Sequence, residues 1–250
     1  MTLKNKPDQQ TRIDDSNLEF KSWLSKNPGK KFSDFYVSKV SSQLDRGKPH
    51  ATIGGRLKGK QDFNESGIPM LNNLIRRGME PGHVCIDYGC GSLRVGQHIM
   101  NYLEPGHFWG LDIADRFFKE GVELLGSEFI DRCRPNLRVI SRESAEEVAA
   151  AKPDFLLSLA VLIHVPPTEV DEFWDHLMTC ITDNTRTLFK IKCSDELIQY
   201  SGRSWTYPET MIEQAIEARG GHCSFEPLRE EHNDELDYQV RHHNLSISRT

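Results

Sequence analysis

The residues best suited to chemistry follow a short apolar run near the start of the stretch VCIDYGCGSLR. The run ends at Asp87, and Gly89 and Gly91 come directly after it, ahead of a helix-like segment that Ser92 could cap. Because glycine lacks a Cβ atom, two glycines allow a tight turn and let a ligand lie against bare backbone. Unpaired N–H groups and the helix dipole attract negative charge at such a junction. The pattern predicts a ligand-binding loop, although glycines alone also fit a purely structural turn.

A second acid, Asp112, ends the next apolar run in FWGLDIA. In a doubly wound sheet, ligands bind where strands end and helices begin. A carboxylate at that place can accept two hydrogen bonds from the vicinal hydroxyls of a ribose. The alternative is a helix cap beside Asp115. We expect Asp112 to bind the sugar of a nucleoside ligand.

Beyond Pro81, the elements that must position these residues alternate between predicted strands and predicted helices. Short apolar runs predict strands at residues 83–87, 107–112, 136–140, 154–159 and 186–192. Amphipathic segments between them predict helices at residues 94–103, 115–125, 144–151 and 167–181. This alternation predicts a parallel sheet covered by helices on both faces. After a helix at 208–219, two strand-like runs around the acidic residues 229–237 predict an antiparallel hairpin at one edge of the sheet.

The first 60 residues have a different character. Apolar side chains at loosely helical spacing on both sides of NPGK predict two short helices that dock on the main domain. Residues 45–60 are rich in glycine and lysine and predict a loop. The predicted division is therefore a tail and helical cap at residues 1–60 and the main domain at 61–250.

The composition of the chain excludes some classes of function. The chain has 250 residues and a formal net charge of −6, which offers no general attraction to nucleic acid or to an anionic membrane. No apolar run approaches the roughly 20 residues that span a bilayer. The six cysteines lie far apart and never form a C-x-x-C pair, so we expect reduced thiols and a cytoplasmic protein.

Metal binding is not predicted from the sequence. His242 and His243 are adjacent in a predicted strand, where neighbouring side chains point to opposite faces, so the pair cannot form one site by itself. We find no other set of residues at ligand spacing along the chain.

The segment DYGCGSLR resembles the first motif of the class I S-adenosylmethionine-dependent methyltransferases, and the resemblance extends over residues 67–248. That motif reads acid-x-Gly-x-Gly-x-Gly. Asp87, Gly89 and Gly91 match it, whereas Leu93 stands in place of the third glycine. The resemblance implies an α/β fold: a doubly wound, mostly parallel seven-stranded Rossmann-like sheet with an antiparallel C-terminal hairpin and an N-terminal helical extension. It also implies an enzyme that uses S-adenosylmethionine.

The resemblance further implies which residues contact this cofactor. The methionine part would be held by Asp87 and the backbone of Gly89, Cys90, Gly91 and Ser92. The ribose would bind Asp112, with Ile113 beside it. The segment RESAEEV would contact the adenine through Glu143 and Ser144, which otherwise simply begin a surface helix. Ser158 and Leu159 would line the floor under the sulfonium.

Methyl transfer to a hydroxyl requires a base, because a proton must leave near the time of attack. His164, a few residues after the fourth predicted strand, is the candidate, although a histidine there can equally orient a loop. In the family that the chain resembles, enzymes that methylate amino groups of nucleic-acid bases or glutamine often carry Asn/Asp-Pro-Pro-Tyr at the end of the fourth strand, and SLAV occupies that place here. We therefore expect a small-molecule acceptor, methylated on oxygen, and no nucleic-acid substrate.

Contacts to the acceptor are expected from the variable segments. Trp205 and Tyr207 would form an apolar wall, and His50 and Arg56 would face an anionic group. Trp205 is otherwise a packing residue and the basic loop a solvated one.

Two other functions remain open at this point. A nicotinamide-dependent oxidoreductase of similar fold needs G-x-G-x-x-G, and Arg94 stands where its third glycine belongs. A cofactor-binding subunit without catalytic activity would carry the same loop. The sequence leaves the oligomeric state, including a homo-oligomer, undecided.

Overall fold

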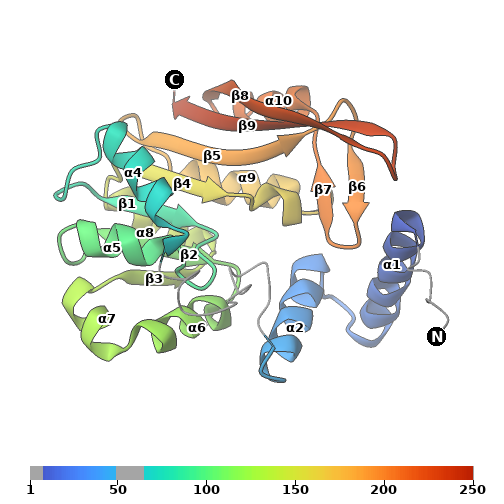
Figure 1. The fold of residues 1–250 in the computed structure, drawn as a ribbon, viewed down its shortest axis with the longest axis horizontal. Coiled ribbons are helices and arrows are strands. Elements are labelled where there is room, and N and C mark those ends of the chain that lie inside the picture. The colour runs from blue at the N-terminus through green and yellow to red at the C-terminus, as the bar shows by residue number, and fades with distance from the viewer. Residues whose placement is uncertain (1–7, 49–64, 250) are drawn as a thin grey trace.

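The computed structural model describes residues 8–48 and 65–249 of the chain. Its centre is a seven-stranded sheet in the order β3-β2-β1-β4-β5-β9-β8 (Figure 1). The strands are β1 (Cys85–Tyr88), β2 (Phe108–Asp112), β3 (Asn136–Val139), β4 (Phe155–Leu159), β5 (Arg186–Cys193), β8 (Gly221–Asn233) and β9 (Tyr238–Arg249). β1 to β5 run parallel, and β9 runs antiparallel to both β5 and β8. The predicted fold class is confirmed.

Helices cover both faces of this sheet and bury two apolar clusters. One cluster receives side chains from α4 (Ile68–Arg76), α5 (Gly96–Tyr102), α6 (Asp115–Leu125) and α7 (Ser127–Cys133). The other receives side chains from α8 (Arg142–Ala150), α9 (Val170–Thr179) and α10 (Glu209–Glu217). Successive side chains of β1 point to opposite faces of the sheet. Cys85 therefore packs in the first cluster, and Ile86 and Tyr88 pack in the second.

The two predicted N-terminal helices are present as α1 (Gln9–Lys26) and α2 (Phe32–Leu44). They lie beside a small hairpin of β6 (Ile198–Ser201) and β7 (Ser204–Thr206) that projects from the main sheet (Figure 1). Asn17 on α1 and Gln199 on β6 exchange side-chain amide hydrogen bonds of 3.2 and 3.0 Å. The ring of Phe32 on α2 meets Trp205 edge to face at 5.0 Å. The hairpin thus links the helical extension to the sheet.

Several predicted boundaries were wrong for local reasons. α5 begins at Gly96 with Val95 as its N-cap, so the expected cap at Ser92 and start at residue 94 are corrected. Leu93 has φ +61°, a left-handed conformation that an α-helix cannot include. β8 continues to Asn233, so the expected loop at 229–237 is shorter than predicted. Short elements β6, β7 and α7 were missed.

The predicted domain boundary near Lys60 lies outside the described residues, as do His50 and Arg56. None of the helices in the described ranges is both long and apolar enough to cross a membrane.

Candidate functional site

The glycine loop after β1 needs its glycines. Gly89 has φ +86° and Gly91 φ +52°. A Cβ atom on Gly89 would lie 2.2 Å from Cγ2 of Val161, which follows β4. The loop therefore approaches the exit of β4 more closely than any other residue type permits.

Leu93 takes a positive φ at the motif's third glycine position while its side chain is fully buried. The left-handed backbone costs about 1–2 kcal/mol, and burial of the leucine side chain offsets that cost. The departure from the glycine motif is therefore accommodated by packing.

Asp112 ties this loop to the end of β2. Its Oδ2 accepts a 2.7 Å hydrogen bond from the amide of Gly91, and its Oδ1 accepts a 2.8 Å bond from the amide of Ile113. Each carboxylate oxygen can accept a second hydrogen bond, so capacity remains for a ligand hydroxyl. The N-cap residue of α6 is Ala114, so Asp112 is not that helix's cap.

A cavity of about 400 Å³ lies at the carboxyl ends of β1, β2 and β4, and residues of α2 and α9 form its opposite wall. This size lies within the range of about 300–1,000 Å³ that is typical of small-molecule sites. Five of the predicted site residues line it, namely Gly89, Asp112, Ile113, Leu159 and His164.

The other predicted residues lie outside the cavity wall. Asp87, Cys90, Ser92 and Ser158 are buried, and the amide of Gly91 points to Asp112. The Oγ atoms of Ser144 and Ser141 each accept a hydrogen bond from the other's amide, at 2.9 and 3.2 Å, and so cap α8. Glu143 is exposed in the first turn of the same helix.

Burial perturbs both acids of the site. Desolvation, together with the nearby Asp112 carboxylate, raises the pKa of Asp87 to about 7, while Arg94 opposes the shift. Desolvation also raises the pKa of Asp112 to about 6, against the two amide hydrogen bonds that stabilise its charged form. Because a nearby positive charge stabilises a buried carboxylate, the pair favours a ligand that carries positive charge near the glycine loop.

His164 is held in the form a base requires. It ends the short 3₁₀ turn η2 (Leu162–His164), and its Nδ1 lies 3.1 Å from the carbonyl oxygen of Arg203. A carbonyl only accepts, so Nδ1 carries the proton and Nε2 keeps the lone pair. The ring also stacks on Tyr36 of α2, with centroids 5.6 Å apart. Desolvation lowers the pKa of His164, which keeps the ring neutral near pH 7.

Sequence reasoning missed most of the uncharged wall. Its aromatic and aliphatic members include Tyr36, Tyr88, Phe117, Ile140 and Phe173. Tyr88 stands inside the motif, between Asp87 and Gly89, and was the one that the pattern could have revealed. Its hydroxyl is buried and has no hydrogen-bond partner among the described residues. A ligand in the cavity could supply that partner.

Acids on α9 and just before it hold α2 over the cavity. The carboxylate of Glu169 accepts the amide of Ser33 at 3.2 and 3.3 Å, and Glu172 forms an ion pair with Lys31. All four residues line the cavity. The N-terminal extension is thus a structural part of the site.

The expected acceptor wall of Trp205 and Tyr207 is corrected. Trp205 packs on Phe32, and the hydroxyl of Tyr207 donates a 2.7 Å hydrogen bond to the carbonyl of Val165. Both side chains are buried and neither lines the cavity, because β7 and the residue after it turn them toward the core.

No protein-family model matches the chain, and no curated protein matches it in sequence. Solved structures do share its fold. Magnesium protoporphyrin IX methyltransferase from Synechocystis PCC 6803, with bound S-adenosylhomocysteine, has a TM-score of 0.55 at 17% identity over 86% of this chain and 99% of its own. An S-adenosylmethionine-dependent methyltransferase from Anabaena variabilis ATCC 29413 has a TM-score of 0.59 at 10% identity over 89% and 97% of the two chains.

A third structure is phosphoethanolamine N-methyltransferase 2 from Haemonchus contortus, in complex with phosphomonomethylethanolamine and S-adenosylhomocysteine. Its TM-score is 0.53 at 11% identity over 73% of this chain and 53% of its own. At such identities the likeness establishes the fold, which is that of the S-adenosylmethionine-dependent methyltransferases.

Proposed function

We propose that this chain transfers a methyl group from S-adenosylmethionine to a small-molecule acceptor, with oxygen as the methylated atom. The proposal depends above all on the position of Asp112. Its carboxylate closes the glycine loop through Gly91 and at the same time forms part of the cavity wall. A sugar-binding acid and a glycine loop in one cavity form a nucleoside site at the sheet's switch point.

The residues present fit the cofactor. Asp112 would bind the ribose, and Ile113, Phe117 and Ile140 offer an apolar wall for the adenine. Gly89 and Leu159 would lie nearest the sulfur, with the buried carboxylate of Asp87 behind the loop. When bound, the cofactor supplies a methyl group on a positively charged sulfur, and the two acids, whose pKa values burial raises, suit that charge.

The protein's own task is then to position the acceptor and take its proton. Nε2 of His164 would remove the hydroxyl proton, and the carbonyl of Arg203 at Nδ1 would stabilise the imidazolium that forms. Tyr36 and Val37 of α2 line the cavity and would shield the reacting atoms from water on that side. Holding the two reactants in line supplies most of the remaining acceleration.

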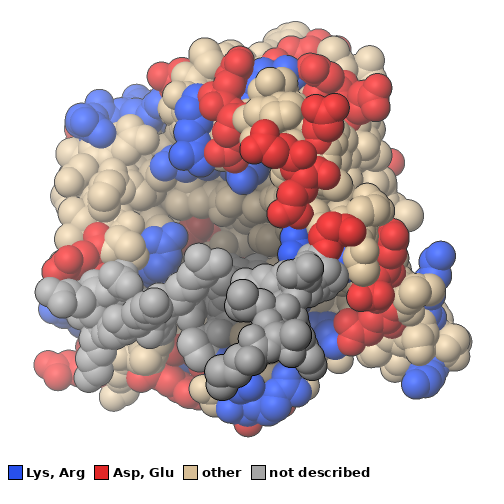
Figure 2. Space-filling model, turned by 45° about the vertical axis from the view of Figure 1, so that its right-hand side comes forward, with Lys and Arg blue, Asp and Glu red and all other residues tan. Residues whose placement is uncertain are grey.

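Charge supports a small acceptor. The net charge of −6 does not favour a polyanionic substrate. Lys and Arg as well as Asp and Glu side chains border a recess with uncharged walls on the face in Figure 2. The Synechocystis and Haemonchus enzymes are named for a porphyrin and for phosphoethanolamine, which are small molecules. We place the protein in the cytoplasm because its six cysteines are free thiols.

Two measurements test the proposal. Calorimetry with S-adenosylmethionine, S-adenosylhomocysteine and NAD is expected to show binding of the first two, and a preference for NAD would refute the proposed cofactor. A screen of metabolite pools with radiolabelled methyl donor is expected to label a small hydroxyl compound. Tight cofactor binding with no pool labelled would instead favour a non-catalytic partner subunit.

A further inference from the structure

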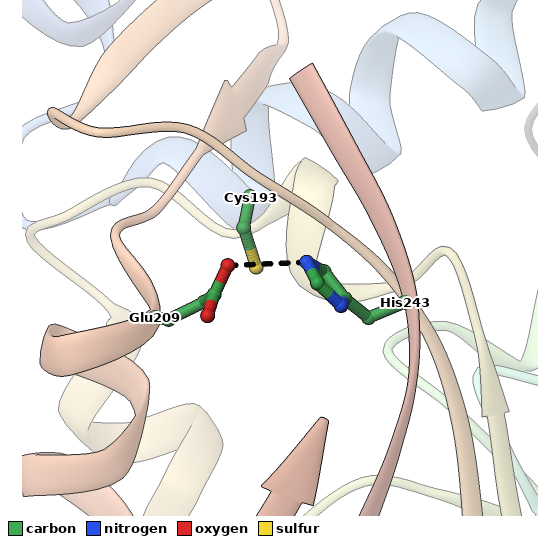
Figure 3. A group of neighbouring side chains, drawn as sticks. All are labelled: Cys193, Glu209 and His243. Atoms are coloured by element: carbon green, nitrogen blue, oxygen red, sulfur yellow. Dashed lines mark ion pairs between the residues drawn. The ribbon is translucent and has the colours of Figure 1, made fainter. Parts of the chain in front are cut away.

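A second group of reactive side chains lies away from the cavity. Cys193 at the end of β5, Glu209 at the start of α10 and His243 on β9 point toward one another (Figure 3). One sulfur, one carboxylate oxygen and one imidazole nitrogen from these residues all lie within 4.8 Å of each other. None of the three residues lines the cavity.

His243 is incompletely paired where it stands. Its side chain is 7% exposed, and neither ring nitrogen has a hydrogen-bond partner among the described residues. Nε2 does lie 3.1 Å from Oε1 of Glu209, at the distance of an ion pair if the ring is protonated (Figure 3), but that contact lacks hydrogen-bond geometry. Buried polar groups are almost always satisfied. A buried imidazole that faces a thiol and a carboxylate without a hydrogen bond to either has both ring nitrogens available to another partner.

We propose that Cys193, Glu209 and His243 bind a divalent transition-metal ion of the zinc type. Thiolate, imidazole and carboxylate are zinc's own ligand types, whereas calcium and magnesium prefer oxygen alone. Zinc bonds of about 2.0–2.3 Å in tetrahedral geometry place ligand atoms about 3.3–3.6 Å apart. Small side-chain movements reach that spacing, and water completes the fourth position.

The charge around the site is balanced for a divalent ion. With an ion bound in place of the thiol proton, Cys193 and Glu209 would together carry two negative charges. Arg241 fixes the carboxylate from outside, with Nε 2.9 Å from Oε1 of Glu209, and its Nη1 lies 2.7 Å from Oδ1 of Asp195. Such an outer hydrogen bond orients a ligating group. His242, the neighbour on the strand, is directed elsewhere and lies 2.9 Å from Glu231.

The location of these three residues indicates a structural role, because the segment next to them also contacts His164, the candidate base. Cys193 and Glu209 bracket the segment that contains β6 and β7. That segment supplies the carbonyl of Arg203 to His164, and Tyr207 bonds to Val165 beside it. An ion that joins the two ends of the segment to β9 would hold the hairpin in place. The sequence analysis, which expected no metal, did not consider this group because its members come from three separate segments of the chain.

The test uses the full-length protein, purified under reducing conditions and stripped with a chelator. We expect one equivalent of Zn²⁺ to bind and to raise the thermal midpoint, and Co²⁺ to give a thiolate charge-transfer absorption. Cys193→Ser and His243→Gln should weaken binding at least about 100-fold and abolish the cobalt band. The matched controls Cys180→Ser and His242→Gln should bind as the parent does.

Folding of the variants is checked by far-ultraviolet circular dichroism. If Cys193→Ser or His243→Gln does not fold, Glu209→Gln serves instead, because Glu209 is the most exposed of the three ligands. It should weaken binding while the fold persists. Absence of stoichiometric binding by the parent, or unchanged affinity in a folded ligand variant, would overturn the proposal. None of these readouts depends on methyl transfer.

Discussion

The carboxylate of Asp112 and the amide of Gly91 meet at 2.7 Å, although they belong to different strand ends. This hydrogen bond makes the glycine loop and the candidate ribose acid a single unit. Because the two groups are hydrogen-bonded and both are buried, movement of one displaces the other. Removing the carboxylate should therefore affect the shape of the loop as well as contact with a sugar.

Asp112→Ala is expected to weaken S-adenosylmethionine binding at least tenfold, which corresponds to about 1.4 kcal/mol, because the bonds of a charged acceptor are lost. Calorimetry measures the effect. Asp115→Ala is the control, since Asp115 is exposed on α6, pairs with Lys119 and does not line the cavity. An affinity of Asp112→Ala equal to that of the control would exclude the ribose role.

The main sheet could be predicted because its elements carry local signals. Each parallel strand is a short apolar run between turn formers, and each covering helix has a continuous apolar stripe. The hairpin of β6 and β7 gives no such signal. Its strands have four and three residues and are held by packing against α1 and α2. Such long-range packing leaves no pattern in the local sequence.

The site was predictable where it depends on the motif and unpredictable where it depends on long-range packing. Gly89, Asp112 and His164 follow strand ends, and strand ends meet at one edge of a parallel sheet. The approach of α2 to α9, which brings Tyr36 beside His164, joins segments more than a hundred residues apart. The capping role of Ser144 differs, because its partner Ser141 is only three residues away and the contact is local.

Gly89→Ala tests how tightly the loop approaches the exit of β4. The new Cβ would meet Val161 at 2.2 Å, and the positive φ adds strain. Gly106→Ala is the matched control, because Gly106 has φ +93° and no atom lies within 4 Å of the place where its new Cβ would stand. Both variants should lose about 1 kcal/mol of unfolding free energy from strain.

Only Gly89→Ala should lose about 1–3 kcal/mol more from the clash and bind cofactor at least tenfold more weakly. Urea unfolding and calorimetry measure the two effects. Equal behaviour of the two variants would show that the close approach does not matter.

Asp87→Asn tests the buried charge behind the loop. An aspartate titrates near 3.8 in the unfolded chain, whereas the pKa of Asp87 in the folded protein is about 7. Between these values the folded state binds more protons, so this group makes the unfolding free energy fall as pH rises from about 4 to 7. The asparagine side chain of the variant cannot ionise, so the variant should not show this fall in unfolding free energy.

Asp87→Asn should therefore gain stability relative to the parent as pH rises through this window. The gain should reach a few kcal/mol at pH 8, since each unit of pKa shift corresponds to about 1.4 kcal/mol. Urea unfolding of both proteins at pH 5 and pH 8 measures it in the absence of cofactor. Parallel pH dependence of the two proteins would contradict a raised pKa at Asp87.

His164→Ala tests the proposed base and needs the acceptor found in the labelling screen. Loss of the base should lower turnover about 100-fold or more and leave S-adenosylmethionine affinity unchanged, because the ring serves the acceptor proton. His222→Ala is the control, since His222 is exposed on β8 and does not line the cavity. Near-normal turnover of His164→Ala would assign the ring a structural role only.

The pH profile separates a base from a packing residue. Burial lowers the pKa of His164, so turnover of the parent should rise with pH and level off once the ring is neutral, below the range usual for histidine. The carbonyl of Arg203 at Nδ1 opposes that shift and keeps the ring oriented. In His164→Ala this rise should disappear, whereas a variant that merely loosens the stacking, such as Tyr36→Leu, should retain it at reduced turnover.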